Sequence, residues 1–216
     1  MTFDHPAPWE DALRGELPGL RRAHVYTPDR ARDPCLDDGP PPPLVLQLYF
    51  NRLPALEAAA SALRAFGRGS EAQAMAVRAY SVPEPASRGA GQPYCTYLVA
   101  YEGPAEDEAA WHARYLAHHP PLMARLPGIR ELEIYTRVEW VAPPGWQASH
   151  CMQRNKVAFD SAAALTAALH SPVRQAMRAD YARLPPFRGA VRHFAMATRV
   201  VQAAAKLTTM RTGLLG

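Results

Sequence analysis

Residues 126–136 read Leu-Pro-Gly-Ile-Arg-Glu-Leu-Glu-Ile-Tyr-Thr, and residues 17–27 read Leu-Pro-Gly-Leu-Arg-Arg-Ala-His-Val-Tyr-Thr. The two phrases lie 109 residues apart, since Gly128 follows Gly19 at that offset. In each phrase a polar stretch typical of a helix ends at Leu-Pro-Gly, and alternating apolar and polar residues follow, which predicts a strand. The repetition indicates that the chain contains two copies of one folding unit.

The repeat continues beyond these phrases. Residues 50–51 fall on residues 159–160 at the same offset, and residues 76–80 fall on residues 190–194 at an offset of 114. Each copy predicts the order helix, strand, strand, helix, strand, and only the second copy has a clear strand before its first helix. The sequence therefore predicts an α+β fold of two tandem ferredoxin-like βαββαβ units, the first of which lacks an opening strand.

The expected boundaries follow from composition and periodicity. The first repeat should occupy residues 1–83 and the second residues 94–201, with a Pro- and Gly-rich linker at 84–93 between them and a tail at 202–216. We expect helices at 8–16, 53–66, 107–117 with a further helical stretch ending at Leu126, and 162–184 with a bend before Pro172, and strands at 20–27, 44–50, 74–82, 94–101, 129–140, 154–159 and 190–200. Residues 28–43, rich in Asp and Pro, should form a stiff loop between two strands.

Because the first unit lacks its opening strand, we expect another segment to fill the gap in its sheet. In a βαββαβ unit this strand lies in the middle of the sheet, and its absence would leave buried backbone groups unpaired. Residues 1–7, the C-terminal tail or a strand from another subunit should therefore fill the gap. The last of these sources would make the protein a homodimer, although an intrachain barrel does not require one.

Composition bounds the class of protein. The chain of 216 residues is 48% hydrophobic and 20% charged, which is typical of globular proteins, and no run of about 18 apolar residues predicts a membrane span. The net charge of +4 comes from dispersed arginines, so we expect no nucleic-acid partner. The start of the chain does not resemble a secretory signal, and three scattered cysteines suit a reducing cytoplasm.

The run from residue 111 to residue 128, Trp-His-Ala-Arg-Tyr-Leu-Ala-His-His-Pro-Pro-Leu-Met-Ala-Arg-Leu-Pro-Gly, resembles the EthD-like family. Its members show an aromatic residue, a spaced His-x-Pro and a Leu-Pro-Gly before the second strand. The resemblance implies the dimeric α/β-barrel superfamily, in which two ferredoxin-like units pack their sheets face to face. It is good over about residues 94–200 and weaker over residues 8–83, so a tandem chain would build the barrel within one polypeptide.

The first copy departs from the family pattern at one place. Glu10 and Trp9 stand where the second copy has His119 and His118. The superfamily includes cofactor-free isomerases, cyclases, dehydratases, decarboxylases and small monooxygenases. The resemblance therefore implies the fold and leaves the reaction open.

Strand alternation divides the side chains between two faces of the sheet. Leu132 and Ile134 should pack on helices, and the opposite, inner face should carry Arg22, His24, Tyr26, Glu131, Glu133 and Tyr135, joined by Gln47 and Tyr49 from the next strand. Such an interior could orient an oxygen-rich ligand, so we predict these residues to bind substrate. The alternative is that the charges are solvated or form structural ion pairs between the two copies.

His119 is the leading catalytic candidate. An imidazole with a pKa near its ordinary value of about 6.5 can take a proton from a carbon acid and return it, and Tyr135 could donate a hydrogen bond to a developing enolate oxygen. His118 competes with His119 as a ligand-binding residue, or it packs with Trp111 and Tyr115 on one helical stripe. The alternative for His119 is a helix-end histidine that contacts free carbonyls.

No cofactor or metal is expected. His112, His118 and His119 cluster in sequence without a carboxylate or cysteine at a ligand spacing, and nothing is specific for haem. The sequence contains no Gly-rich phosphate loop, nucleophile elbow or Cys-x-x-Cys motif.

These observations lead to three functional hypotheses. The first is a cofactor-independent enzyme of isomerase, lyase or cyclase type that transfers protons on a small oxygenated aromatic or lactone metabolite held between the two sheets. The second is a non-catalytic ligand-binding or accessory barrel of a catabolic cluster. The third is a cofactor-free monooxygenase.

Overall fold

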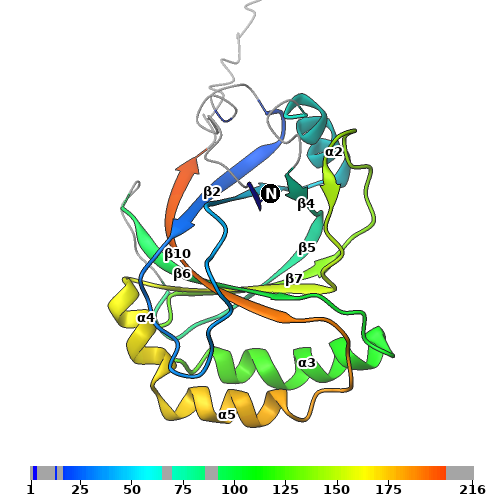
Figure 1. Cartoon of the computed structure of the whole chain (residues 1–216). Helices are drawn as coiled ribbons and strands as arrows, with labels where there is room; N and C mark the ends of the chain where they lie inside the picture. The colour runs from blue at the N-terminus through cyan, green and yellow to red at the C-terminus, as the bar shows by residue number, and fades with distance from the viewer. Residues whose placement is uncertain (1, 4–12, 14–16, 65–69, 86–91, 203–216) are drawn as a thin grey trace, which may run out of the picture.

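The computed structural model describes residues 2–3, 13, 17–64, 70–85 and 92–202 of the chain (Figure 1). The strands are β1 (Thr2–Phe3), β2 (Leu20–Pro28), β3 (Leu44–Phe50), β4 (Glu71–Ala72), β5 (Met75–Tyr80), β6 (Tyr94–Tyr101), β7 (Glu131–Arg137), β8 (Gln147–Ala148), β9 (Gln153–Phe159) and β10 (Val191–Gln202). The helices are α2 (Leu53–Ala62), α3 (Glu108–Met123), α4 (Ala162–Leu169) and α5 (Pro172–Tyr181). None of the described helices is long and apolar enough to cross a membrane.

The strands form one sheet in the order β5-β7-β9-β6-β10-β2-β3-β1-β4-β8. β10 of the second repeat pairs antiparallel with β2 of the first, and β5 of the first repeat pairs antiparallel with β7 of the second. β5 stands at one end of this order and β4 stands next to the other end. Only Gln73 and Ala74 separate them along the chain, so one short stretch of chain joins the two ends of the sheet. The sheet therefore curls into the barrel that Figure 1 shows end-on, and the fold is the predicted pair of ferredoxin-like units closed within one chain.

The place of the missing opening strand is taken by β1. Thr2 pairs with Val45 of β3 and with Glu71 of β4, and Phe3 pairs with Leu44, all in antiparallel register. β1 thus lies between β3 and β4, where the opening strand of the first unit belongs. Of the three expected sources the N-terminal one is correct, because Thr2 and Phe3 supply the segment.

The helices α3, α4 and α5 cover the outer face of the second repeat's sheet (Figure 1). Between them lies the main core, in which the rings of Trp111 and Tyr115 from α3 pack with Phe159 of β9. Leu132 and Ile134 of β7 are fully buried in this core, so they face the helices as the alternation predicts. Burying such large side chains supplies most of the drive for folding.

The hairpin connections of the two repeats are exchanged. Residues 29–43, between β2 and β3, run past β10 and β6 to the α4 side of the second repeat (Figure 1), where the Arg32 amide donates to Thr166. Residues 138–152, between β7 and β9, reach the first repeat, where the Val141 amide donates to Glu57 and the Trp146 indole to the Arg64 carbonyl. Each repeat therefore packs a connection of its own against the helical side of the other.

Some element boundaries differ from the sequence-based expectation. α3 continues through Pro120 and Pro121, where we expected an interruption. The expected helix at 162–184 is two helices, because Pro172 starts α5 at the position where its fixed φ and missing N–H suit a helix start. The expected strand at 74–82 is the shorter β5, and the separate strand β4 precedes it outside the expected range. The expected helix at 8–16, most of the linker and all of the tail beyond residue 202 lie largely or wholly outside the described residues.

The duplicated Leu-Pro-Gly phrase closes the same turn twice. Gly19 and Gly128 have φ values of +82° and +72°, a region that L side chains rarely adopt. The amide of the following residue reaches back to the carbonyl of the leucine in both copies, Leu20 to Leu17 at 3.0 Å and Ile129 to Leu126 at 3.2 Å. The phrase is therefore repeated because the turn needs its glycine.

These two glycines offer a matched stability test. A Cβ at Gly128 would meet nothing within 4 Å, whereas a Cβ at Gly19 would lie 2.9 Å from the Cβ of Ala55. We expect Gly128→Ala to lower the free energy of unfolding by about 1–2 kcal/mol through backbone strain alone. Gly19→Ala should lower it further, because the clash adds to the strain. Urea unfolding of both variants measures the difference, and equal losses would contradict it.

Candidate active site

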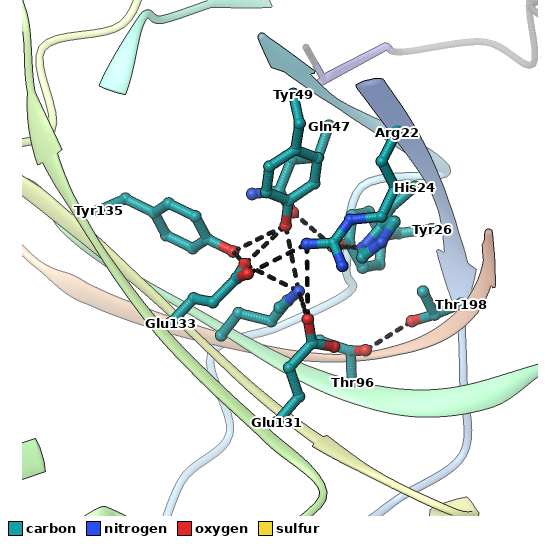
Figure 2. A network of polar contacts seen from close by, with 11 residues as sticks. Arg22, His24, Tyr26, Gln47, Tyr49, Thr96, Glu131, Glu133, Tyr135 and Thr198 are labelled. Carbon is teal, nitrogen blue, oxygen red and sulfur yellow. Dashed lines mark hydrogen bonds and ion pairs between the residues drawn. The ribbon is translucent and has the colours of Figure 1, made fainter. Parts of the chain in front are cut away.

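Polar side chains from four strands meet inside the barrel (Figure 2). The Lys156 side chain is fully buried, and its ammonium lies 2.8 Å from Glu131 and 2.9 Å from Glu133. Arg22 comes from the other repeat and lies 3.1 Å from Glu133 and 4.3 Å above the ring centroid of Tyr49. Two cations and two carboxylates therefore balance one another in the interior.

Tyrosine hydroxyls extend this network. The hydroxyls of Tyr49 and Tyr135 both donate to Glu133, the first at 2.6 Å. Burial alone would raise the pKa of the Glu133 carboxyl, but Lys156 and the two hydroxyls lower it to about 2. A second set of hydrogen bonds lies beside the first. Nδ1 of His24 lies 3.0 Å from the Tyr26 hydroxyl, which donates to Gln47.

All eight side chains that we placed on the inner face or beside it therefore come together (Figure 2), and their contacts are largely with one another. Arg22 and Tyr49 belong to the first repeat, and Glu131, Glu133 and Lys156 to the second. The geometry is that of ion pairs joining the two copies, the structural alternative raised above. A cavity of about 510 Å³ reaches Tyr26, Gln47, Tyr49 and Tyr135 and continues along α2, and none of the described histidines lines it.

His119 lies on the other face of the second repeat's sheet. On α3 it continues the buried stripe of Trp111 and Tyr115 in steps of four residues, the spacing that brings side chains onto one helical face. Its Nδ1 lies 2.9 Å from Oδ2 of Asp180 on α5, and Arg114 lies 3.2 Å from the other oxygen of that carboxylate. The carboxylate therefore fixes the ring and leaves Nε2 as the nitrogen for a ligand.

Two expectations and one alternative given above for these residues are wrong. His119 and Tyr135 do not share a pocket, because β7 directs Tyr135 into the barrel while His119 packs on the helical side. His118, expected on the stripe or at the ligand, is exposed and lines neither cavity, because the four-residue steps pass through His119. His119 is also not a helix-end residue, since α3 continues to Met123.

A second cavity, of about 370 Å³, lies between α3, α5 and the sheet, and His119 is in its wall. Most of the lining is apolar, from residues such as Val99, Leu165 and Met177, and the polar groups are few and include Tyr97, Asn155, Arg174 and His193. Small-molecule sites commonly combine an apolar wall with a few convergent polar groups. This helix–sheet cavity is therefore the candidate active site.

The exchanged connection 29–43 completes the helix–sheet cavity. Asp38 lies 2.8 Å from Nδ1 of His193, whose ring stacks on Tyr97 with centroids 5.6 Å apart. Asp33 lies 2.8 Å from Arg174 and accepts a hydrogen bond from the Tyr97 hydroxyl at 2.7 Å. Sequence reasoning treated this segment as a stiff loop, although its spaced aspartates were a signal that it meets cations. The first repeat thus supplies two carboxylates that hold lining residues of a cavity of the second.

Burial lowers the pKa of both cavity histidines below the ordinary value, and the paired carboxylates oppose the effect in each case. His119 and His193 are therefore neutral imidazoles at neutral pH. A neutral imidazole with one nitrogen held by a carboxylate can accept a proton through the other.

The same shifts predict how stability responds to acid. His112, His119 and His193 have pKa values lowered in the folded protein, so the unfolded chain binds protons first as the pH falls. Stability should be complete above about pH 6.5 and should decline as the pH falls below that value, before Asp and Glu titrate. The double variant His119→Gln/His193→Gln should show a shallower decline in urea unfolding between about pH 7.5 and 5. An unchanged slope would show that these histidines do not carry the effect.

Among the described residues, no group of three or more His, Cys, Asp and Glu side chains is placed to hold a metal ion. The three cysteines have no disulfide partner, and Cys95 and Cys151 are buried.

Comparisons with known proteins place the fold. Neither a protein-family model nor a curated protein matches the chain. A solved structure described as an anthrone oxidase-like protein superposes with a TM-score of 0.59 at 13% sequence identity, over 93% of this chain and 88% of that chain. A second solved structure, an EthD family protein from Bacillus halodurans, has a TM-score of 0.34 and 21% identity over 46% of this chain and 96% of that chain. The chain shares its barrel fold with the first of these proteins, and the second bears the name of the family that the sequence resembles.

Proposed function

We propose that the chain is a small-molecule enzyme that transfers a proton on a carbon acid, with the helix–sheet cavity as its active site and His119 as the base. The observation that carries the proposal is the buried pair of His119 and Asp180 in the wall of an otherwise largely apolar cavity. Pairs of this kind hold an imidazole in one tautomer and stabilise the imidazolium that forms.

The proposed step uses groups already in place. Nε2 of His119 takes a proton from a carbon that is next to a carbonyl or conjugated with one through an aromatic ring. Asp180 stabilises the imidazolium by accepting a hydrogen bond from its Nδ1–H. The imidazolium then returns the proton to another carbon, which gives isomerisation, or to a leaving oxygen, which gives elimination. No redox partner is needed for either outcome.

The apolar and aromatic lining suits a planar oxygenated aromatic or a lactone. Tyr97 and Tyr101 contribute rings to the wall beside Met177. The proposed ligand site therefore lies between the sheet and the helices, whereas the sequence suggested a site between the two sheets. Tyr135 lies on the opposite face of the sheet and has no part in the proposed step.

Deuterium exchange tests the proposal directly. Anthrone is an aromatic ketone with an acidic methylene, and we expect the protein to accelerate exchange of its methylene protons with D₂O under nitrogen, followed by NMR. Mass spectrometry of metabolites retained by the protein from a cell extract should then identify the natural ligand. A protein that retains ligands but exchanges no proton on them would be a binding protein, which would end the enzymatic proposal.

Oxidation by molecular oxygen is a second candidate, favoured by the fold shared with a protein described as anthrone oxidase-like. It begins with the same deprotonation, after which anthrone and O₂ give anthraquinone and water. Oxygen uptake that depends on anthrone would support it, and exchange without uptake would leave the proton-transfer enzyme. The homodimer and the cytoplasmic location expected from the sequence stay predictions, and light scattering on the purified chain would test the first.

A further inference from the structure

Arg174 is a buried cation whose hydrogen bonds are incomplete. It is the third residue of α5, is only 8% exposed and lies in the wall of the helix–sheet cavity. One nitrogen, Nη2, donates to Asp33 at 2.8 Å. Its Nε is buried and has no acceptor in the part of the chain that the structure describes. A buried donor without an acceptor is destabilising, so such groups are rare and call for an explanation.

Asp33 is not free to take both donors of the guanidinium. Its Oδ2 already accepts from the Tyr97 hydroxyl at 2.7 Å as well as from Arg174, and its Oδ1 accepts from the backbone amide of Cys35 at 2.8 Å. A carboxylate that paired with Arg174 in the usual bidentate manner would use the two parallel N–H groups together. The Arg174 guanidinium therefore makes one of the two parallel hydrogen bonds of a bidentate pair with Asp33, and its Nε–H is left without an acceptor among the described residues.

The other polar groups of the cavity do not fill it either. His119 is held by Asp180, and His193 is held by Asp38. Asn155 donates to the Tyr115 hydroxyl at 2.6 Å. The remaining charged group of the wall, Arg178, is a cation and supplies no acceptor, and the rest of the wall is apolar or aromatic. An oxygen on a bound ligand is therefore the acceptor that the cavity leaves open to Arg174.

We propose that Arg174 donates to a ligand oxygen that becomes negatively charged when His119 removes the proton, so that the site takes phenols and enolisable aromatic ketones. This inference rests on the proposed function and names its substrate class. As the C–H bond breaks, its electron pair forms the enolate C=C bond, the carbonyl π pair moves to oxygen, and the proton goes to Nε2. The Arg174 guanidinium stabilises the oxygen anion by a charge-assisted hydrogen bond.

A binding experiment with para-nitrophenol tests the assignment, because its phenolate absorbs visible light and mimics an enolate. The wild-type protein should bind the phenolate more tightly than naphthalene, a planar hydrocarbon, and should raise the phenolate fraction of bound para-nitrophenol. Arg174→Gln should weaken phenolate binding roughly ten- to hundredfold and leave naphthalene binding unchanged. Arg183→Gln is the matched control, since Arg183 lies just past the C-terminal end of the same helix, is exposed and lines neither cavity.

A second variant protects the test against misfolding. Asp33→Asn removes the negative charge that competes for Arg174, so it should tighten phenolate binding. The assignment is overturned if the wild type binds neither probe or shows no preference for the phenolate, or if Arg174→Gln binds it as tightly as the wild type. If anthrone exchange is catalysed without a phenolate preference, this inference fails alone. If the preference is present without exchange, the proposed function fails and the oxyanion site stands.

Discussion

Replacing His119 with Gln should slow deuterium exchange on anthrone by roughly two to four orders of magnitude, the contribution typical of a positioned general base. Glutamine keeps a polar side chain of similar reach but cannot accept the proton. Affinity for a non-reacting ligand such as naphthalene should change only a few-fold, because the apolar wall that binds it remains. Exchange rates from NMR and affinities from calorimetry measure the two effects separately.

His118 is the matched control for this substitution. It is the preceding residue on α3, carries the same imidazole and is exposed. His118→Gln should leave exchange unchanged. Loss of exchange in both variants would point to damage of the helix, and full activity in His119→Gln would remove the proposed base.

Lys156→Met should have the largest effect on stability. The substitution leaves Glu131 and Glu133 facing each other without the ammonium that both contact at less than 3 Å. Removing one partner of a buried ion pair typically lowers the free energy of unfolding by about 3–5 kcal/mol. Urea unfolding measures the loss, and the double variant Lys156→Met/Glu133→Gln should recover part of it because the uncompensated charge is gone.

The pH dependence of the free energy of unfolding tests the same ion pair independently. Glu133 has its pKa lowered to about 2 in the folded protein, so its contribution is complete above the unfolded value of about 4.5 and is lost as the pH falls towards 2. Without Lys156 the buried carboxylate should prefer its proton, and the acid-induced loss should become smaller. Arg192 is the control, since it pairs with Glu102 at 2.8 Å on the surface, and Arg192→Met should cost about 1 kcal/mol or less. Equal losses for Lys156→Met and Arg192→Met would contradict the prediction.

Local pattern predicted the two repeats and the side chains of the inner face, and the resemblance to the EthD-like family implied the barrel. The repeated Leu-Pro-Gly phrase reflects a turn that requires positive φ, and strand alternation reflects the two-residue period of a sheet, so both can be read from short stretches. The same alternation put Arg22, Glu131 and Glu133 on one face. It could not tell whether these charges would bind a ligand or one another, because that depends on which strand of the other repeat lies opposite.

The helix–sheet cavity could not be predicted in the same way. Asp180 lies 61 residues from His119, and Asp38 lies 155 residues from His193. These pairs form because α5 packs on α3 and because residues 29–43 cross to the second repeat. Neither arrangement produces a periodic pattern in the sequence. Arg174 was missed for a further reason, since a missing hydrogen bond is visible only when the surroundings are known.

The exchanged hairpin connections have a consequence for how such a chain can change. Two identical subunits related by a two-fold axis must carry every substitution in both sites, whether or not both benefit. Fusion of the copies lifts that restriction, and the sequence has used the freedom, with Glu10 where the other copy has His119. Because residues 29–43 of one copy lie across the cavity of the other, selection on either half still acts through its neighbour. The two halves have diverged in sequence, and the contacts of residues 29–43 still tie the substitutions that one half tolerates to the structure of the other.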